Sequence, residues 1–235
     1  MTVGASVGGS ALSKAFVGTV PVQRIYVGAD KAWPVELAYL NGGAYAGASV
    51  GFGAVAPGDL IVMIAQRVST TAAAAPSVPA STATVPVWHQ VWNSGSAPLA
   101  ATMAWGIAES SSITSGTWTG AEVITFLHFS NGKSVGASVA SYQATPADNL
   151  GAVSALTPQR ADSQVFAYYA NNATAGAYVK PAAGVEDSYG YLNLFSTTKM
   201  CVNRKVDTSS VPVAKQGHAA SNLHWRGIHF EVLPK

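Results

Sequence analysis

The stretch DLIVMIAQ, residues 59–66, is apolar at every position between its two ends. A strand with one face in water alternates apolar and polar residues, whereas an unbroken apolar run is typical of a strand covered on both faces. We therefore expect a central strand here, with sheet against one face and a loop or a neighbouring chain against the other.

Other short apolar runs follow, each bounded by Gly, Pro, Ser or Asn, and they occupy residues 85–93, 99–109, 116–131, 133–144, 162–172, 190–197 and 223–234. Alternation within them is clear in two places: Leu99, Ala101, Met103, Trp105 and Ile107 fall on one strand face, and Ile228, Phe230 and Val232 fall on a face opposite His229 and Glu231. No long amphipathic helix pattern competes with these strands. The sequence predicts an all-β fold, a β-sandwich of the jelly-roll type.

The composition indicates assembly rather than an isolated soluble monomer. The chain has 235 residues, of which 49% are apolar and only 10% are charged, against ~25% charged in an average domain. A surface with so few charges is better suited to contact with neighbouring subunits. The net charge of +2 comes from 13 basic and 11 acidic residues with no like-charge run, so we do not expect a nucleic-acid partner.

No apolar run reaches the ~18 residues of a membrane span, and the N-terminal residues lack the pattern of a signal peptide. We therefore expect a product that is made in the cytoplasm and stays there unless it is built into a particle. The single cysteine, Cys201, rules out an internal disulfide and is interpreted as a buried thiol, with an intermolecular disulfide as the alternative.

The N-terminal part of the chain has a different organisation. Residues 1–16 are small and read as an arm, and VPVQRIYV (20–27), a turn at 28–30 and KAWPV (31–35) predict a β-hairpin. Residues 36–53, ELAYLNGGAYAGASVGFG, are interpreted as a loop-rich passage to the main body. The expected domains are a 1–38 arm and docking hairpin and a 39–235 β-sandwich domain.

The hairpin is the candidate interface. Two strands are marginally stable alone in water, and this pair has an apolar face with little local sequence to cover it. Trp33 is the expected anchor, because tryptophan is enriched among interface hot spots. The predicted docking residues are Ile25, Tyr26, Val27 and Trp33.

Residues with catalytic or metal-binding chemistry do not form a recognisable pattern. His224 and His229 lie on opposite faces of a straight strand, unless a bulge at Gly227 realigns them, and no ligand stands at a zinc-site spacing. His89 and His128 are interpreted as core or interface residues. GFGAVAPG (51–58) lacks the helix that a dinucleotide site requires, and Glu186-Asp187 reads as a polar turn. We expect no catalytic residue, no metal and no cofactor.

The aromatic residues leave two interpretations open. We expect Trp105 and Trp118 to pack in the sandwich and one or both of Trp88 and Trp92 to be exposed. Tyrosine suits interfaces because its ring can be buried while its hydroxyl group contacts water. The candidates for a surface or interface position are Tyr168, Tyr169, Tyr189 and Tyr191. Aromatic platforms that stack on sugar rings are the alternative.

Several of these motifs together resemble a known family. VAPGDLIVMIAQR (55–67), VPVWHQVWN (85–93), LAATMAWGIAES (99–110), GTWTG (116–120), ADSQVFAYYANN (161–172) with VKPAAGVED (179–187), and LHWRGIHFEVLP (223–234) resemble a β-sandwich domain of bacteriophage tail and virion proteins. The opening FVGTVPVQRIYVGADKAWP (16–34) is similar to the N-terminal module of minor tail proteins from phages of actinobacteria. One departure is Val85-Pro-Val-Trp88, where such domains more often have a Gly-Trp turn.

The resemblance implies a structural virion protein, a minor tail or tail-tip subunit that assembles with other phage tail proteins and with copies of itself. The alternative function is a receptor- or glycan-binding module on the virion surface that contacts a host-surface glycan. A depolymerising enzyme is the third and weakest candidate.

An internal similarity between residues 59–65 and 162–168, each beginning with Asp, also suggests that two packed sheets share a pseudo-symmetry.

Overall fold

The computed structural model describes residues 16–17, 20–21, 25–27, 30–33, 36–69, 71–147, 156–171, 187–192, 199–205 and 223–235, with side chains in 36–69, 71–142, 156–168, 170 and 226–235. Every regular element in these ranges is a β-strand, which confirms the all-β class.

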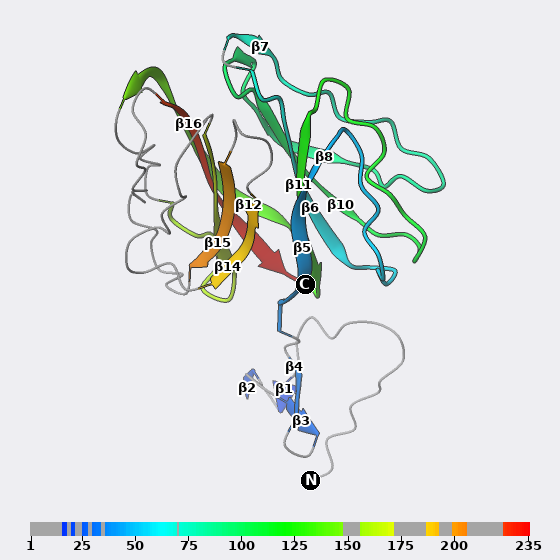
Figure 1. Ribbon diagram of the computed structural model, residues 1–235. Helices are drawn as coiled ribbons and strands as arrows, with labels where there is room; N and C mark the ends of the chain where they lie inside the picture. The colour runs from blue at the N-terminus through cyan, green and yellow to red at the C-terminus, as the bar shows by residue number, and fades with distance from the viewer. Residues whose placement is uncertain are drawn as a thin grey trace.

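Two five-stranded antiparallel sheets form the body (Figure 1). The first has, in spatial order, β5 (Ala38–Ala46), β11 (Val123–Ser130), β6 (Leu60–Gln66), β10 (Ala101–Ile107) and β8 (His89–Asn93). The second has β12 (Gly132–Ala147), β16 (Leu223–Pro234), β13 (Gln164–Asn171), β15 (Lys199–Lys205) and β14 (Asp187–Leu192).

Short pairs of strands complete the description. In the body β7 (Ala73–Ala74) pairs with β9 (Ser96–Ala97). Near the N-terminus β1 (Phe16–Val17) pairs with β2 (Val20–Pro21), and β3 (Ile25–Val27) pairs with β4 (Asp30–Trp33).

The main core lies between the two sheets, because one buried cluster draws its side chains from both. β6 and β11 contribute Leu60, Val62, Ile64, Val123, Leu127 and Phe129, and β13 and β16 contribute Phe166, Tyr168, Ile228, Phe230 and Val232. Phe166 stacks on Phe230 within the second sheet and meets Phe129 of the first edge to face. The body is therefore a β-sandwich, and the predicted inward face of Ile228, Phe230 and Val232 is confirmed.

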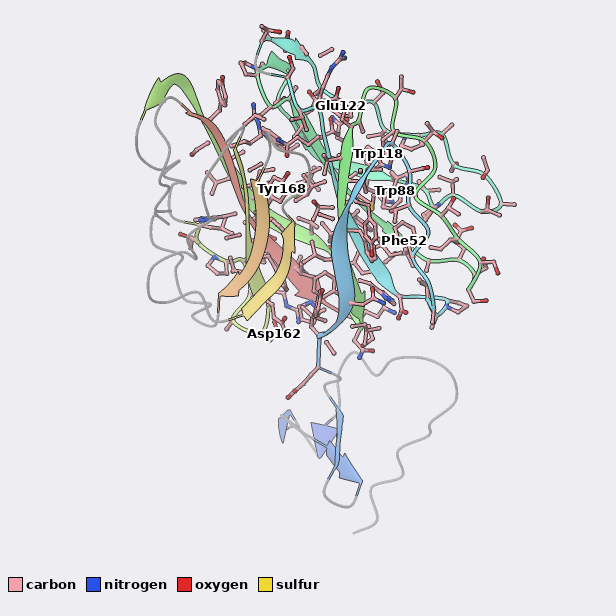
Figure 2. All side chains as sticks on the ribbon, in the orientation of Figure 1. Phe52, Trp88, Trp118, Glu122, Asp162 and Tyr168 are labelled. Carbon is pink, nitrogen blue, oxygen red and sulfur yellow. The ribbon has the colours of Figure 1, made fainter. Side chains whose placement is uncertain are left out.

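The outer face of the first sheet is also buried. Ile61, Met63 and Ala65 of β6 pack there against Phe52, Trp88 and Trp118 from long connections. Figure 2 shows these three aromatic side chains on the opposite side of the sheet from Tyr168. The prediction that β6 is covered by sheet on one face and by loops on the other is confirmed.

The two sheets have the same topology. In each, the first strand in chain order lies at an edge and is followed across the sheet by the fifth, second, fourth and third strands. The chain completes the first sheet before it enters the second at Asn131. In a jelly roll, successive strands alternate between the two sheets. The predicted jelly-roll strand order is therefore not confirmed. The two stretches of the sequence echo end in β6 and β13, the central strands of the two sheets.

The structure corrects the interpretation of residues 36–53 as a loop. Residues 38–46 form β5, which pairs with β11 from Ala38↔Ser130 to Ala46↔Val123. A Cβ on Gly42 would lie 2.5 Å from the Phe126 carbonyl oxygen, so glycine allows the close pairing, yet Gly42-Gly43 has the composition of a loop. The strand β15 was also missed, because Lys199–Lys205 is largely polar.

Candidate functional site

The predicted docking residues lie on β3 and β4. Ile25 is opposite Trp33, and Tyr26 is opposite Lys31 in this antiparallel pair, so the predicted hairpin strands are present. Figure 1 shows the pair beyond the end of β5, apart from the two large sheets. The side chains of Ile25, Tyr26, Val27 and Trp33 lie outside the described ones, and their interface role and the boundary near residue 38 stay predictions.

A buried His-Asp pair fastens the start of β6. His128 Nε2 lies 2.7 Å from Asp59 Oδ2, and the same oxygen accepts a hydrogen bond from the Ala56 backbone N–H. Asp59 immediately precedes β6, and His128 is on the outer face of β11. His128 Nδ1 is buried and has no hydrogen-bond partner among the described residues. In a catalytic triad this second ring nitrogen would be bonded to a nucleophile. The described contacts of the pair are therefore those of a structural hydrogen bond.

A buried glutamate holds the equivalent place in the second sheet. Glu231 accepts hydrogen bonds from the Ser163 hydroxyl at 2.5 Å and from the backbone N–H groups of Gln159, Arg160 and Ala137 at 2.9 to 3.1 Å. Burial raises the pKa of Glu231, but these hydrogen bonds to the carboxylate outweigh it and leave the pKa below its ordinary value. Glu231 is therefore an ionised structural group.

The two polar pairs occupy corresponding positions. His128 is opposite Ile61, two residues after Asp59, and Glu231 is opposite Val165, two residues after Ser163. Each pair therefore joins the residue before the central strand to the fifth strand of its own sheet. The two sheets can therefore be aligned residue by residue, with His128 matched to Glu231 and Asp59 matched to Ser163.

Two tryptophans form the centre of the outer layer. Trp88 and Trp118 both donate their indole N–H to the Ser115 carbonyl, at 3.1 and 3.2 Å, and their rings lie 5.6 Å apart. Trp118 is packed as predicted, but it lies in the connection before β11 rather than in a strand. Trp88 is buried, so of the two tryptophans with predicted exposure only the half-buried Trp92 partly reaches solvent.

The most unusual site lies at the start of β16, where a charged side chain points between the sheets. Arg226 is 2% exposed, and its guanidinium lies between the rings of Trp92 and Tyr142, at 5.0 and 4.8 Å from their centres. Its Nε donates to the Leu99 carbonyl at 2.7 Å, and Nη2 reaches the Pro98 carbonyl at 3.4 Å. Leu99 has a φ of 50°, so Arg226 braces a strained turn.

Burial lowers the pKa of Arg226 to about 10, against the opposing effect of Tyr142 and Tyr168. The side chain is still charged at neutral pH. Burial likewise raises the pKa of Tyr142, and the nearby Arg226 lowers it by less.

Tyr168 borders this site and corrects a prediction. It was a candidate for a surface or interface position, but it is fully buried and its hydroxyl donates to Gln66 Oε1. Its position on the inner face of the central strand β13 decides this, because β16 and β15 flank it and the first sheet covers it. The side chains of Tyr169, Tyr189, Tyr191 and Cys201 lie outside the described ones.

A second aromatic pair joins β8 and β10 at the edge of the first sheet. The exposed ring of His89 on β8 stacks on Trp105 of β10, with 4.2 Å between ring centres and 22° between planes. Trp105 is half-buried and packs at the margin of the main core, as predicted. With Trp92 and Tyr142 it makes this side of the sandwich aromatic. We name the group of His89, Trp92, Trp105, Tyr142 and Arg226 the seam cluster.

The sequence pattern of β16 indicates where Arg226 lies. Arg226 alternates with Ile228, Phe230 and Val232 on the inner face of its strand, so a charge was predictable between the sheets. Its partners come from three other segments and had no local signal.

No protein-family model, curated protein or solved structure matches the chain. In the described ranges no group of three or more His, Cys, Asp or Glu side chains is placed to hold a metal ion. Those same ranges contain no helix with the length and apolar character to cross a membrane.

Proposed function

We propose that the chain is a structural subunit of a bacteriophage tail, which acts through protein–protein assembly with other tail proteins and with copies of itself. The resemblance of its motifs to tail proteins supports this, as does its low content of charged residues. Its site of action is then the virion, after assembly in the host cytoplasm.

One observation carries the docking role of the N-terminal part. Side chains from Leu37 onward are buried in two core clusters, whereas β3 and β4 are three and four residues long and form a two-stranded sheet. A two-stranded sheet of this size needs further contacts to be stable in water. A neighbouring tail subunit provides them in this proposal, with Trp33 as the anchor.

The acids that the described residues bury argue against the enzyme alternative. Asp59 is bonded to His128 and to a backbone N–H, and Glu231 accepts four hydrogen bonds. Glycosidases need one carboxyl group as acid and another as base or nucleophile across a cleft. Both carboxyl groups here are committed to structure.

The test is replacement of Trp33 by Ala in the phage. We expect folded protein that is absent from purified tails or is released from them easily, because an interface tryptophan contributes about 2 kcal/mol or more. Quantitative mass spectrometry of purified particles measures its occupancy. Tyr45→Ala is the matched control, since Tyr45 is an exposed aromatic of the body; normal occupancy of Trp33→Ala, or equal loss of both variants, would contradict the docking role.

The second candidate function is binding of a host-surface glycan. The seam cluster favours it, because half-buried rings at an open edge offer flat apolar surface beside polar groups. Glycan binding and tail assembly are compatible in one subunit, since they use different parts of the chain.

A further inference from the structure

We propose that the body does not join its sheets to those of neighbouring subunits, because a β-bulge in each of its four edge strands blocks the pairing of a foreign strand. The edge of a sheet presents unpaired N–H and C=O groups that pair readily with another chain. This inference rests on the proposed assembly function and specifies its contacts. Copies of the chain then meet through side chains and the N-terminal part, and not through shared sheets.

The first argument is the place of the irregularities in strand pairing. The pairs that β6 makes with β10 and β11, and that β13 makes with β15 and β16, are in regular register. Every pair that involves an edge strand of the two large sheets contains a bulge, with the extra residue in the edge strand. The extra residues include Leu40 in β5, Val91 in β8, Gly136 in β12 and Tyr189 in β14.

The second argument is that the bulge of the first edge strand has the same place in both sheets. In β5 the extra residue lies between the partners of His128 and Phe129. In β12 the extra residue lies between the partners of Phe230 and Val232, on the two sides of Glu231. Glu231 is the residue matched to His128 when the two sheets are aligned.

The bulge of the other edge strand is repeated in the same way. Val91 of β8 lies between the partners of residues 103 and 104, which are opposite residues 63–64 of β6. Tyr189 of β14 lies between the partners of residues 202 and 203, which are opposite residues 167–168 of β13. The alignment of the two sheets matches 63–64 with 167–168. Bulges that recur at fixed places although the inserted residues differ are features of the fold.

The third argument is the further protection of β12, the longest of the described strands. Its register shifts at two more places, and the extra residues there are the exposed Lys133 and residues 144–146, the last of which is Pro146. Lysine and proline are both typical of edge strands that do not accept a partner. The strand with the longest edge therefore has the most interruptions.

The buried Glu231 holds the central bulge of β12 in place. The Ala137 N–H at this bulge donates to Glu231 Oε2 at 3.1 Å. A Cβ on Gly136 would lie 2.5 Å from the same oxygen, so glycine allows the carboxylate to approach the bulged backbone. The carboxylate thus fixes the irregular shape of the edge as well as the start of the central strand.

The experiment is deletion of Val91 from the full-length chain. Gln90 and Trp92 then become consecutive and keep their partners Ala104 and Met103, so the edge of β8 becomes regular without loss of another pair. We expect the concentration at which half of the chains self-associate to fall about tenfold or more below that of the wild type. Light scattering after size-exclusion chromatography measures it; unchanged association of the folded variant would overturn the proposal.

Two matched variants separate strand pairing from a general effect of the deletion. Val91→Ser keeps the extra residue and should associate as the wild type does. Gln90→Lys, at an exposed position, places a charge on the regular edge of the chain that lacks Val91 and should reverse the association. Association that persists in this second variant would come from misfolded chains and would reject the proposal.

Deletion of Leu40 tests the proposal if the chain without Val91 does not fold. Leu40 is 48% exposed, so its removal lowers the exposed apolar surface and by itself should reduce association. A regular β5 edge should increase association instead, by about threefold because β14 lies beside part of this edge. Reduced or unchanged association would contradict the role of the bulges.

This outcome is separate from that of tail docking. The chain without Val91 has an intact docking hairpin, and Trp33→Ala has intact sheet edges. Increased association without Val91, together with normal occupancy of Trp33→Ala in tails, would support the blocked edges and reject the docking role. Unchanged association, together with loss of Trp33→Ala from tails, would do the reverse.

Discussion

A pair of hydrogen-bonded polar side chains lies at the start of each central strand of this sandwich. Asp59 with His128 and Ser163 with Glu231 each tie the residue before a central strand to the fifth strand of the same sheet. Polar groups in such places contribute to stability only while all their bonds are made. Their loss should therefore be costly although they perform no chemistry.

Glu231→Gln tests this at the second sheet. The amide has one acceptor oxygen in place of two, and its NH2 group would face a backbone N–H, so we expect a loss of about 1–3 kcal/mol in the free energy of unfolding at neutral pH. Urea denaturation measures it. Glu109→Gln, at an exposed position, is the control and should change stability by less than about 0.5 kcal/mol.

The same variant should change the response to acid. Because the pKa of Glu231 is lower in the folded protein than its ordinary value of 4.5, its contribution is complete above that value and is lost as pH falls through the folded pKa. Wild-type stability should then decline below about pH 4.5 more steeply than that of Glu231→Gln. Parallel curves between pH 5 and pH 2 would show that Glu231 is not the group responsible.

At the scale of strands, the sequence predicted those with a strong apolar pattern. The run 59–66 identified β6 as a strand covered on both faces, and the limits of 223–234 match β16. Edge strand β5 was missed because its pairing depends on Gly42, whose lack of a side chain reads as a loop in sequence but allows contact with β11. The Arg226 site was missed because it depends on packing between segments far apart in the chain.

Gly42→Ala tests β5 directly. A methyl group there would lie 2.5 Å from the Phe126 carbonyl oxygen and 2.8 Å from the Tyr39 hydroxyl, so the strand must move away from β11. We expect a destabilisation of about 1–3 kcal/mol, measured by thermal and urea unfolding. Gly51→Ala has no atom within 4 Å of the new methyl group and should be neutral; an equally neutral Gly42→Ala would argue against the close β5–β11 pairing.

At the scale of the molecule, two sheets of one topology share a core, and a loop layer covers the outer face of the first. The first sheet begins with β5, so the body needs residues from 36 onward. Among the N-terminal residues that the structure describes, strands β1 to β4 form two separate two-stranded sheets. This division is the basis of the proposed function, in which the body folds by itself and the N-terminal part docks.

The most direct test of this division is differential scanning calorimetry of a chain that starts at Glu36, beside the full chain and a chain that starts at Val50. The account predicts a single cooperative transition for the Glu36 chain, within a few degrees of the full chain. The Val50 chain lacks β5 and exposes the edge of β11, so its transition should fall by about 5 °C or more or disappear. A Glu36 chain that fails to fold, or a Val50 chain as stable as the full chain, would contradict the account.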